Sequence, residues 1–424
     1  MNYNPTLHKL SNGVTVILDP MDLETVNVKV LFRIGSRDEA PHEYGITHFC
    51  EHMLCKGTTR FPTQRHLKEY LEYHGGARNA STGNNRITFY GRIIAENLNI
   101  LIDLIGDQIQ NSLFDPEKIE LERKVIADER RRALDNPGRQ FGDFISGKLF
   151  NYAVFSYRTL GPFENIASFS RAQMLGFLAR RLSAKNCIIG ISGKINDIDG
   201  VLKHLEKTFA FLPFCAVDEN TAITYTPQIA HNLQSDKKNI KLDIYFPEIF
   251  DATYENRFKN MCVAKFKRHL IQELQQVVRQ QNGLVYGLGS CDLGNEKMSV
   301  TGISTETAAE NIAQVVKLIA STSHKIYSQN TITDETLNRF RNMNKLSRAD
   351  FLESPSQRCD TLISEYRWYD RLYDFYETKK MSDSITRDDV IENSRGFFAG
   401  PMSIMTQGAD FKDDLNAIWI ENFK

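Results

Sequence analysis

The stretch 45–57 constrains this chain most, because its residues fit an α-helix with two chemically different faces. One face is apolar and suited to a protein core, and it carries Ile46, Phe49, Cys50 and Met53. The opposite face carries His48, Glu51, His52 and Cys55. The pattern therefore predicts a helix that packs against a core and presents two histidines, a carboxylate and a thiol on its other side.

The two histidines are four residues apart, so they lie one helical turn apart and both imidazoles can bind one metal ion. Glu51 projects beside them and can accept a proton from a water molecule on the metal. The alternative is a polar helix face whose histidines meet only solvent or a hydrogen-bond partner. A His-x-x-Glu-His pattern arises by chance in roughly one chain in a hundred of this length. We therefore interpret the pattern as a metal site.

The composition describes an ordinary globular protein. The 424 residues are enough for two or three domains, with 41% hydrophobic and 25% charged residues. The 52 basic and 53 acidic residues nearly balance, so we expect no binding to nucleic acid or to membranes. The N-terminus has no signal-peptide pattern, and no apolar run is long enough to span a membrane. Seven scattered cysteines favour reduced thiols, and hence a cytoplasmic protein.

The two halves of the chain contain similar α+β patterns. In the first half, strands are predicted at 7–18 (a hairpin around Ser11-Asn12-Gly13), 26–34, 86–94 and 187–191. Helices are predicted there at 62–73, 95–112, 116–134, 140–150, 169–182 and 196–209. In the second half, strands are predicted at 240–246, 298–304 and 402–407, and helices at 253–281, 308–326, 333–350, 356–376 and 387–398. We predict a zinc-binding catalytic domain at 1–212, a linker at 213–227 and a second domain of similar fold at 228–424.

Two histidines make an incomplete site, because catalytic zinc usually takes three protein ligands and keeps a fourth position for water. The helix predicted at 116–134 has a face that carries Glu122, Val125, Ile126, Glu129 and Ala133. Carboxylates within an apolar stripe are costly unless they are paired or bound to a cation. Glu122 and Glu129 are therefore candidate ligands, and the alternative is a buried ion pair with an arginine. The run Arg130-Arg131-Arg132 on the same helix is interpreted as a solvated face.

The motif His48-x-x-Glu51-His52, followed by Glu129, resembles the inverted-zincin peptidases of the M16 family, which includes pitrilysin and the mitochondrial processing peptidase. Further sequence similarity lies in the residues around the motif, Gly45–Thr58, and in Gly75-Gly76 and Gly161-Pro162 with Glu164. The resemblance covers both halves and is most specific over 7–193. It implies one zinc ion per chain, bound by His48, His52 and Glu129, with Glu51 as the general base. It also implies that Glu122 is an acidic residue supporting the ligands.

The resemblance implies a fold as well: two homologous α/β-roll domains of the LuxS/MPP-like metallohydrolase type, so that one chain is half of a clamshell. The implied activity is that of a zinc-dependent endopeptidase that cleaves unstructured peptides in an enclosed dimer chamber. Arg279 precedes Gly283 and would ordinarily be a solvated helix end. In the family, an Arg and a Tyr with the spacing of Arg279 and Tyr286 hold the substrate and serve the partner's zinc site. We therefore expect a homodimer with composite active sites.

Substrate peptides are expected, by resemblance, to pair with an edge strand formed by Asn79, Ala80, Ser81 and Thr82. Cys55 departs from the family pattern, in which Phe is common and helps to form the pocket after the cleaved bond, so the substrate preference of relatives does not transfer. Two alternative functions remain: a dedicated processing or maturation peptidase for one precursor, and a non-catalytic scaffold subunit of the same fold. The intact zinc motif argues against the scaffold.

Overall fold

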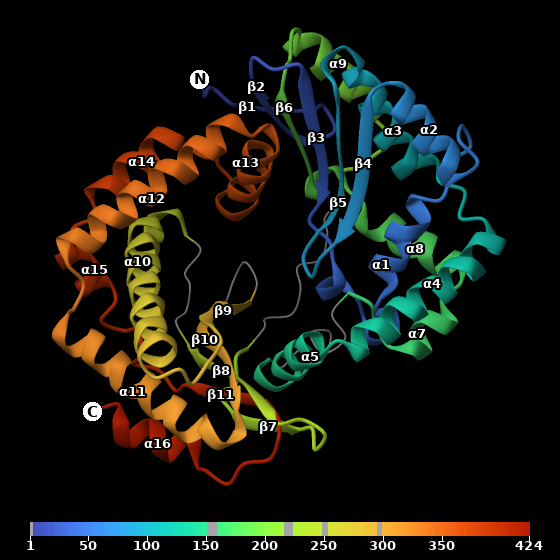
Figure 1. Cartoon of the computed structure of the whole chain (residues 1–424). Coiled ribbons are helices and arrows are strands. Elements are labelled where there is room, and N and C mark those ends of the chain that lie inside the picture. Colours follow the sequence, from blue (N-terminus) through green and yellow to red (C-terminus); the bar gives the residue numbers. More distant parts are fainter. Residues whose placement is uncertain (1–2, 151–158, 216–223, 248–252, 295–298) are drawn as a thin grey trace. The chain divides into compact units, whose positions relative to one another are not determined.

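The computed structural model describes residues 3–150, 159–215, 224–247, 253–294 and 299–424 (Figure 1). The chain divides into two compact units. Unit 1 comprises Met1–Asp143, Ala153–Ala222 and Arg348–Tyr373, and unit 2 comprises Phe144–Tyr152, Ile223–Ser347 and Asp374–Lys424. Each unit has its own sheet and its own buried apolar cluster. The fold is therefore mixed α and β, as the sequence predicted.

Unit 1 is built on a six-stranded sheet in the order β1-β2-β6-β3-β5-β4. Its strands are β1 Thr6–Lys9, β2 Thr15–Pro20, β3 Thr25–Phe32, β4 Gly76–Thr82, β5 Ile87–Ile94 and β6 Cys187–Gly193. Only β2 and β6 pair in parallel. The predicted hairpin at 7–18 is confirmed, with Gly13 at a φ of 94° in its turn. The strand that contains residues 79–82, expected only by resemblance, is β4, and it forms one edge of the sheet.

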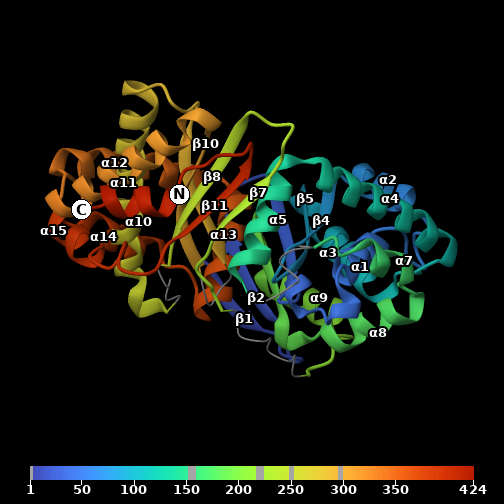
Figure 2. The ribbon, with the colours of Figure 1, turned by 90° about the horizontal axis from the view of Figure 1, so that it is seen from below.

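Helices cover both faces of this sheet. Those of unit 1 are α1 Ile46–Leu54, α2 Gln64–Tyr73, α3 Leu98–Asn111, α4 Pro116–Asp135, α7 Phe163–Ser168, α8 Arg171–Arg181, α9 Ile198–Thr208 and α13 Pro355–Tyr369; α5 Pro137–Leu149 crosses the boundary between the units. The helix α1 packs against β4, α4, α7 and α8 (Figure 2). The opposite face of the sheet is covered by α13, which contacts β2, β3 and β6.

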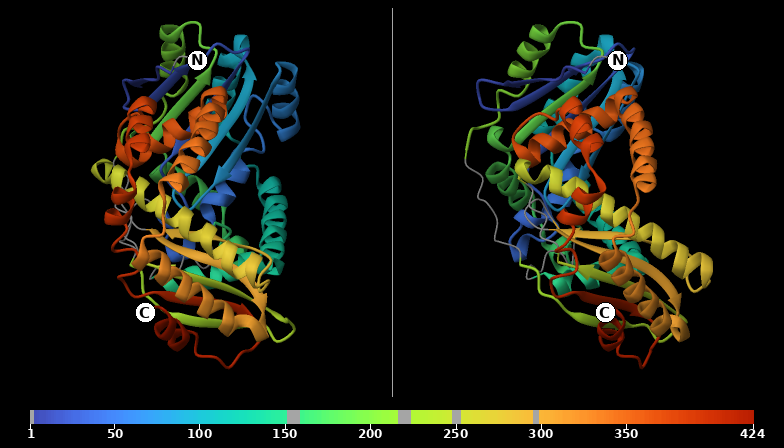
Figure 3. Two further views of the ribbon diagram at one scale, coloured as in Figure 1. Left: turned by 60° about the vertical axis from the view of Figure 1, so that its left-hand side comes forward. Right: turned by 90° about the vertical axis from the view of Figure 1, so that its left-hand side faces the viewer.

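Unit 2 is built on a five-stranded sheet in the order β7-β11-β8-β10-β9. Its strands are β7 Ile229–Leu233, β8 Asn239–Phe246, β9 Leu288–Gly294, β10 Ser299–Ala308 and β11 Ser403–Gly408. Its helices are α10 Arg257–Leu274, which continues as a π-helix at Gln275–Gln281, then α11 Ile312–Gln329, α12 Asp334–Glu353, α14 Phe375–Ser384, α15 Arg387–Asn393 and α16 Leu415–Asn422; the end of α12 lies in unit 1. Figure 3 shows the C-terminal strand β11, in red, inside this sheet between β7 and β8.

The two sheets share one topology. Five strands of unit 1 (β2 to β6) correspond in chain order to the five strands of unit 2 (β7 to β11), and we call these five the common set. In both sheets their spatial order is first, fifth, second, fourth, third. The first and fifth strands pair in parallel, and all other neighbours pair antiparallel. The strand β1 is an addition to unit 1. Five strands are enough to make such an order specific, so the expected similarity of fold between the two halves is confirmed.

The helix α13 belongs to unit 1, although the sequence placed all of 228–424 in one second domain. Its Arg358 is completely buried and donates to the carboxylate of Asp19 on β2, with Nε 2.7 Å from Oδ2. The predicted helix at 356–376 is in fact two helices, because Asp370 takes a left-handed φ of 50° after Tyr369 and ends α13. Among the described residues, no helix combines the length and apolar character that a bilayer crossing requires.

Candidate metal centre

The helix α1 folds as its two-faced pattern predicts. Its apolar residues Ile46, Phe49, Cys50 and Met53 are buried. Its N-terminus is held by Glu39, whose carboxylate accepts hydrogen bonds from the backbone N–H groups of Gly45 and Thr47, both at 2.8 Å. These N–H groups have no partner within the helix, so Glu39 replaces a conventional cap. Sequence reasoning missed Glu39, because it lies outside the positions where capping side chains are usually sought.

Gly45 is required at the start of α1, because its backbone conformation and its close neighbours leave no room for a side chain. Its φ is 99°, and a Cβ atom there would lie 2.6 Å from the carbonyl oxygen of Leu160. Gly161 has a φ of 69°, and its Cβ would meet the carbonyl oxygen of Tyr44 at 2.0 Å. Two glycines thus let the segment around Leu160 lie directly on the N-terminus of α1.

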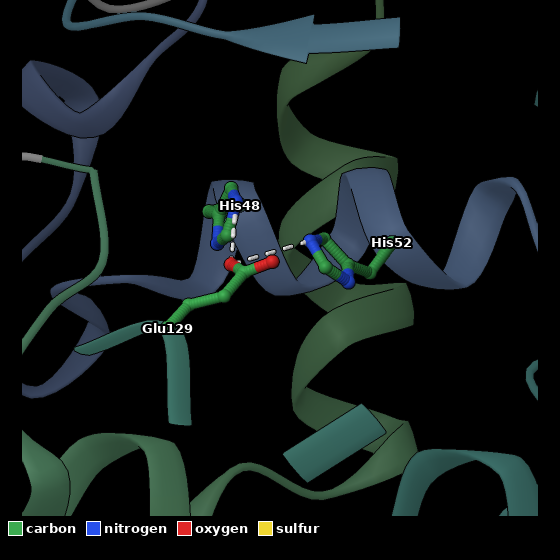
Figure 4. Close-up of side chains that lie close together, drawn as sticks. All are labelled: His48, His52 and Glu129. Atoms are coloured by element: carbon green, nitrogen blue, oxygen red, sulfur yellow. Dashed lines mark ion pairs between the residues drawn. The ribbon is translucent and has the colours of Figure 1, made fainter. Parts of the chain in front are cut away.

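The three predicted ligands converge on one point. Glu129 comes from α4 and points between the two imidazoles (Figure 4). Its Oε2 lies 3.7 Å from Nε2 of His48 and 3.8 Å from Nε2 of His52. Two ligand atoms about 2.1 Å from a tetrahedral zinc would be about 3.4 Å apart, so small side-chain rotations would close the site. Among the described residues this is the group of His, Cys, Asp and Glu that meets the geometry of a metal site.

Glu122 supports the ligands from behind. Its Oε2 lies 2.8 Å from Nδ1 of His52, and its Oε1 lies 2.7 Å from Nζ of Lys56. Burial alone would raise the pKa of Glu122, but the hydrogen bonds from His52 and Lys56 outweigh it and lower the pKa. An ionised Glu122 that accepts from Nδ1 of His52 leaves the lone pair of Nε2 free for a metal.

His48 has an environment that favours a neutral ligand. Burial, aided by the nearby His52 and Arg139, lowers its pKa from 6.5 to about 3. Its Nδ1 is buried and has no hydrogen-bond partner among the residues that the structure describes. A neutral imidazole is the form that binds a metal through a free nitrogen. His48 is therefore available as a ligand at neutral pH.

Glu51 is held beside the ligands by the edge strand. The hydroxyl of Thr82 on β4 donates to Oε2 of Glu51 at 2.8 Å. Burial raises the pKa of Glu51, although this hydrogen bond opposes the shift. A carboxylate with a raised pKa is better suited to take up and return a proton near neutral pH.

The thiol of Cys55 contacts side chains of β4 and α3. Its Sγ lies 3.6 Å from a guanidinium nitrogen of Arg78 and 3.7 Å from Nε2 of Gln108. Burial raises the pKa of its thiol. The thiol is therefore protonated at neutral pH, and a position in a substrate pocket stays a prediction.

A cavity of about 470 Å³ opens onto the candidate centre. It is lined by His48, Glu51 and Glu129, by Ala80, Ser81 and Thr82 of β4, by Arg132, Ala133, Asn136 and Arg139, and by Thr159 and Leu160. Asn79, the fourth predicted substrate residue, lies on β4 outside this lining. The interpretation of the arginine run at 130–132 as a solvated face is wrong for Arg130, which is buried and 3.6 Å from Asp143.

Arg279 and Tyr286 lie in unit 2, whereas the candidate metal ligands lie in unit 1. The helix ends where the sequence predicts, with Gly283 at a φ of 66°. The guanidinium carbon of Arg279 lies 5.6 Å from the centre of the Tyr286 ring. Tyr286 is 93% exposed, so within the described part of the chain the ring is free to meet another molecule.

Comparison with known proteins agrees with this geometry. The sequence model of insulinase, peptidase family M16, matches residues 15–162, and that of the M16 inactive domain matches residues 168–344. A Rickettsia felis protein named "Uncharacterized zinc protease" is 25% identical over 98% of this chain and 99% of its own length. A probable beta subunit of the mitochondrial processing peptidase from Arabidopsis thaliana is 31% identical, over 48% of this chain and 38% of its own length.

Solved structures show the same fold. A protease from Helicobacter pylori superposes with a TM-score of 0.82 at 18% identity, covering 96% of this chain and 100% of its own. The first half of the periplasmic protease PqqL from Escherichia coli superposes with a TM-score of 0.80 at 16% identity, covering 100% of this chain and 98% of its own. In the whole PqqL chain, the match covers 51% of the length.

Proposed function

Because the chain belongs to peptidase family M16, we propose that it is a zinc-dependent endopeptidase that cleaves unstructured peptides. One observation carries this proposal: His48, His52 and Glu129 converge beside a cavity that Glu51 also lines. A non-catalytic scaffold of the same fold has no need for this set. The proposed metal is one zinc ion per chain, since two imidazoles and one carboxylate are typical ligands of catalytic zinc.

Zinc bound here would supply Lewis acidity, which acidifies a water molecule and polarises a peptide carbonyl. The side chains of the protein carry out the proton transfers. Glu51 accepts the proton from the attacking water and then delivers it to the nitrogen of the leaving amine. Thr82 fixes the orientation of Glu51, and Glu122 fixes that of His52. The buried, neutral His48 keeps its lone pair for the metal.

The edge strand β4 is the proposed docking strand for the substrate. An edge strand has one row of unpaired backbone N–H and C=O groups, to which an extended peptide can add. Ala80, Ser81 and Thr82 line the cavity beside Glu51, which would place the scissile bond near the candidate centre. Asn79 extends the same strand. Folded proteins lack a free extended segment, so unstructured peptides are the proposed substrates.

A second copy of the chain is proposed to complete the active site. This chain corresponds to about half of the PqqL protease chain, and two copies would supply the equivalent of a whole. Each copy would contribute Arg279 and Tyr286 to stabilise the negative charge that develops on the carbonyl oxygen at the partner's centre. The exposure of Tyr286 supports this role.

A dedicated processing peptidase for one precursor is a second candidate, favoured by the similarity to the beta subunit of the mitochondrial processing peptidase. It would use the same centre with a narrower substrate range. All seven cysteines are free thiols. This agrees with a reducing compartment, and a cytoplasmic location stays a prediction.

The test is cleavage of a quenched, unstructured peptide by the purified protein, with and without a chelator. Glu51→Gln and Arg279→Ala are assayed singly and as a 1:1 mixture after subunit exchange. Activity that the chelator abolishes, that each variant loses, and that the mixture partly restores would support a zinc peptidase with composite sites. Activity that persists in the chelator or in Glu51→Gln would contradict the proposal. Loss without restoration on mixing would contradict only the shared site.

A further inference from the structure

The consecutive arginines Arg130, Arg131 and Arg132 on α4 have three different environments. Arg130 is buried beside Asp143. Arg131 is exposed, pairs with Asp128, and lies 6.0 Å from the centre of the Phe163 ring. Arg132 is also exposed, and it lines the cavity at the candidate metal centre. Because Arg132 follows Glu129 by three residues, the two side chains share one face of the helix.

Arg139, at the start of α5, lines the same cavity from the next helix. Its charge is close enough to His48 to contribute to the lowered pKa of that imidazole. Among the described residues, neither Arg132 nor Arg139 has an acidic side chain within ion-pair distance, although the other three arginines on these two helices do.

Two arginines that have no acidic partner among the described residues thus line the space beside the candidate centre. The acids that line this space are Glu51 and Glu129, whose charges the two arginines balance. A zinc ion bound by Glu129 and the histidines would add positive charge, so the cavity of the loaded protein favours an anion. Arginine is also the side chain best shaped to bind a carboxylate through two parallel hydrogen bonds.

We propose that Arg132 and Arg139 form a subsite for a carboxylate of the substrate, so that the enzyme prefers peptides with an acidic group near the cleaved bond. This inference rests on the proposed function and adds a substrate class to it. The carboxylate can come from an Asp or Glu side chain or from the free C-terminus of a short peptide. Both sources present the same group, and an experiment can separate them.

Binding is measured first, with zinc-loaded Glu51→Gln protein and fluorescent decapeptides of Ala, Gly and Ser. One peptide carries a central Glu and another a central Gln, both with blocked ends; a third carries Gln and a free C-terminal carboxylate. We expect the Glu peptide to bind about tenfold to a hundredfold more tightly than the blocked Gln peptide. An advantage of the third peptide alone would assign the subsite to the chain terminus.

Variants test whether this preference depends on the two arginines. Arg132→Gln combined with Arg139→Gln removes the preference, whereas Arg131→Gln on the adjacent position of the same helix retains it. Arg139→Glu, with its zinc content and circular dichroism checked, shifts the preference toward a peptide with a central Lys. Equal binding of the Glu and blocked Gln peptides, with no advantage for the third peptide, overturns the inference, as does a preference that survives in the double variant.

Cleavage by the wild-type protein separates this inference from the proposed function. Glu is moved position by position along the peptide, and kcat/KM is compared with that of the Gln peptide at each position. An increase of about tenfold at one position, lost in the double variant, supports the subsite. Cleavage without any such increase overturns the subsite alone. Arginine-dependent binding with no cleavage of any peptide supports the subsite and contradicts the proposed peptidase function.

Discussion

Unit 1 and unit 2 arrange five strands in the same order, but they place different side chains at equivalent positions. In unit 1 the helix α1 is the first α-helix between β3 and β4 along the chain. In unit 2 the helix α10 lies at the equivalent place, between β8 and β9. One face of α1 carries His48, Glu51 and His52, whereas the buried His269 of α10 is hydrogen-bonded to Thr331 at 2.9 Å. A histidine on this helix is therefore a ligand candidate only where other ligands join it.

The second ligand-bearing helix shows the same contrast. In unit 1 the strand β5 is followed by α3 and then α4, and in unit 2 the strand β10 is followed by α11 and then α12. The helices α4 and α12 therefore occupy equivalent places in the two units. Counted from the first residue of each helix, Phe340 and Ser347 of α12 take the places of Glu122 and Glu129. Phe340 is buried in the apolar cluster of unit 2. The fold thus provides the positions for a metal centre twice, and the choice of a few side chains decides which copy can use them.

The largest expected effect is on catalysis in unit 1. Glu51→Gln removes the proton acceptor without removing a ligand, so kcat should fall by about a thousandfold while zinc content stays unchanged. The measurement is peptide cleavage together with metal analysis. The control substitution is His269→Gln, on the corresponding helix of unit 2. It should leave kcat within about twofold of the wild-type value. A loss of activity in His269→Gln with its fold intact would mean that the two units are not as different as their side chains indicate.

A second prediction concerns α13, which follows residues of unit 2 in the sequence but packs in unit 1. Arg358→Ala leaves the buried carboxylate of Asp19 unpaired, and should lower the free energy of unfolding by about 3–5 kcal/mol. Denaturant unfolding measures this loss. The double variant Asp19→Leu with Arg358→Met should lose less than Arg358→Ala, because neither charge remains buried. A loss below about 1 kcal/mol in Arg358→Ala would show that α13 is not anchored by this pair.

Zinc affinity should respond to the residue behind the ligands. Glu122→Gln weakens the hydrogen bond that orients His52, and should reduce zinc affinity by about tenfold to a hundredfold. Competition with a chromogenic chelator measures the affinity. Glu120→Gln is the matched control, because Glu120 lies on the same helix but is exposed and pairs with Arg123. Equal affinities in the two variants would exclude a supporting role for Glu122.

The smallest expected effect is on the pH dependence of the metal-free protein. His48 has a pKa of about 3 in the folded state, below its ordinary value of 6.5, so the unfolded chain binds its proton more readily. The resulting loss of stability is absent above pH 6.5 and grows as the pH falls toward 3, by up to about 1.4 kcal/mol per pH unit. Unfolding in chelator at pH 7.5 and 5.5 measures it. The free energies of unfolding of the wild type and of His48→Gln should converge at pH 7.5 and differ at pH 5.5. An equal dependence of the free energy of unfolding on pH in the two proteins would contradict the lowered pKa of His48.

Local patterns in the sequence predicted much of unit 1 and its site. The faces of α1 and the placement of Glu122 and Glu129 on one side of α4 follow from helical periodicity, which depends only on neighbouring residues. The polar strand β4 has no such pattern, and it forms because it pairs with β5 along its full length. For similar reasons the sequence missed β7 and the short helices α14 and α16.

Side-chain contacts that helical or strand periodicity does not predict account for the remaining differences. The ion pair of Arg358 with Asp19 places α13 in unit 1, and no local pattern reveals a partner so far away. Arg130 pairs with Asp143 of the next helix. This side chain is therefore buried, although the sequence predicted that it is solvated. Glu39 caps α1 from a loop. In each case a buried polar side chain was missed because its partner could be identified only from the folded chain.

The most direct test of the difference between the two units is the zinc content of the purified chain. The protein is loaded with excess zinc, freed of unbound metal and analysed by mass spectrometry of the metal. We predict about one zinc ion per chain for the wild type and for His269→Gln, and about none for the double variant His48→Ala with His52→Ala. A wild-type chain without zinc, or a double variant that retains it, would contradict the assignment of the metal centre to unit 1.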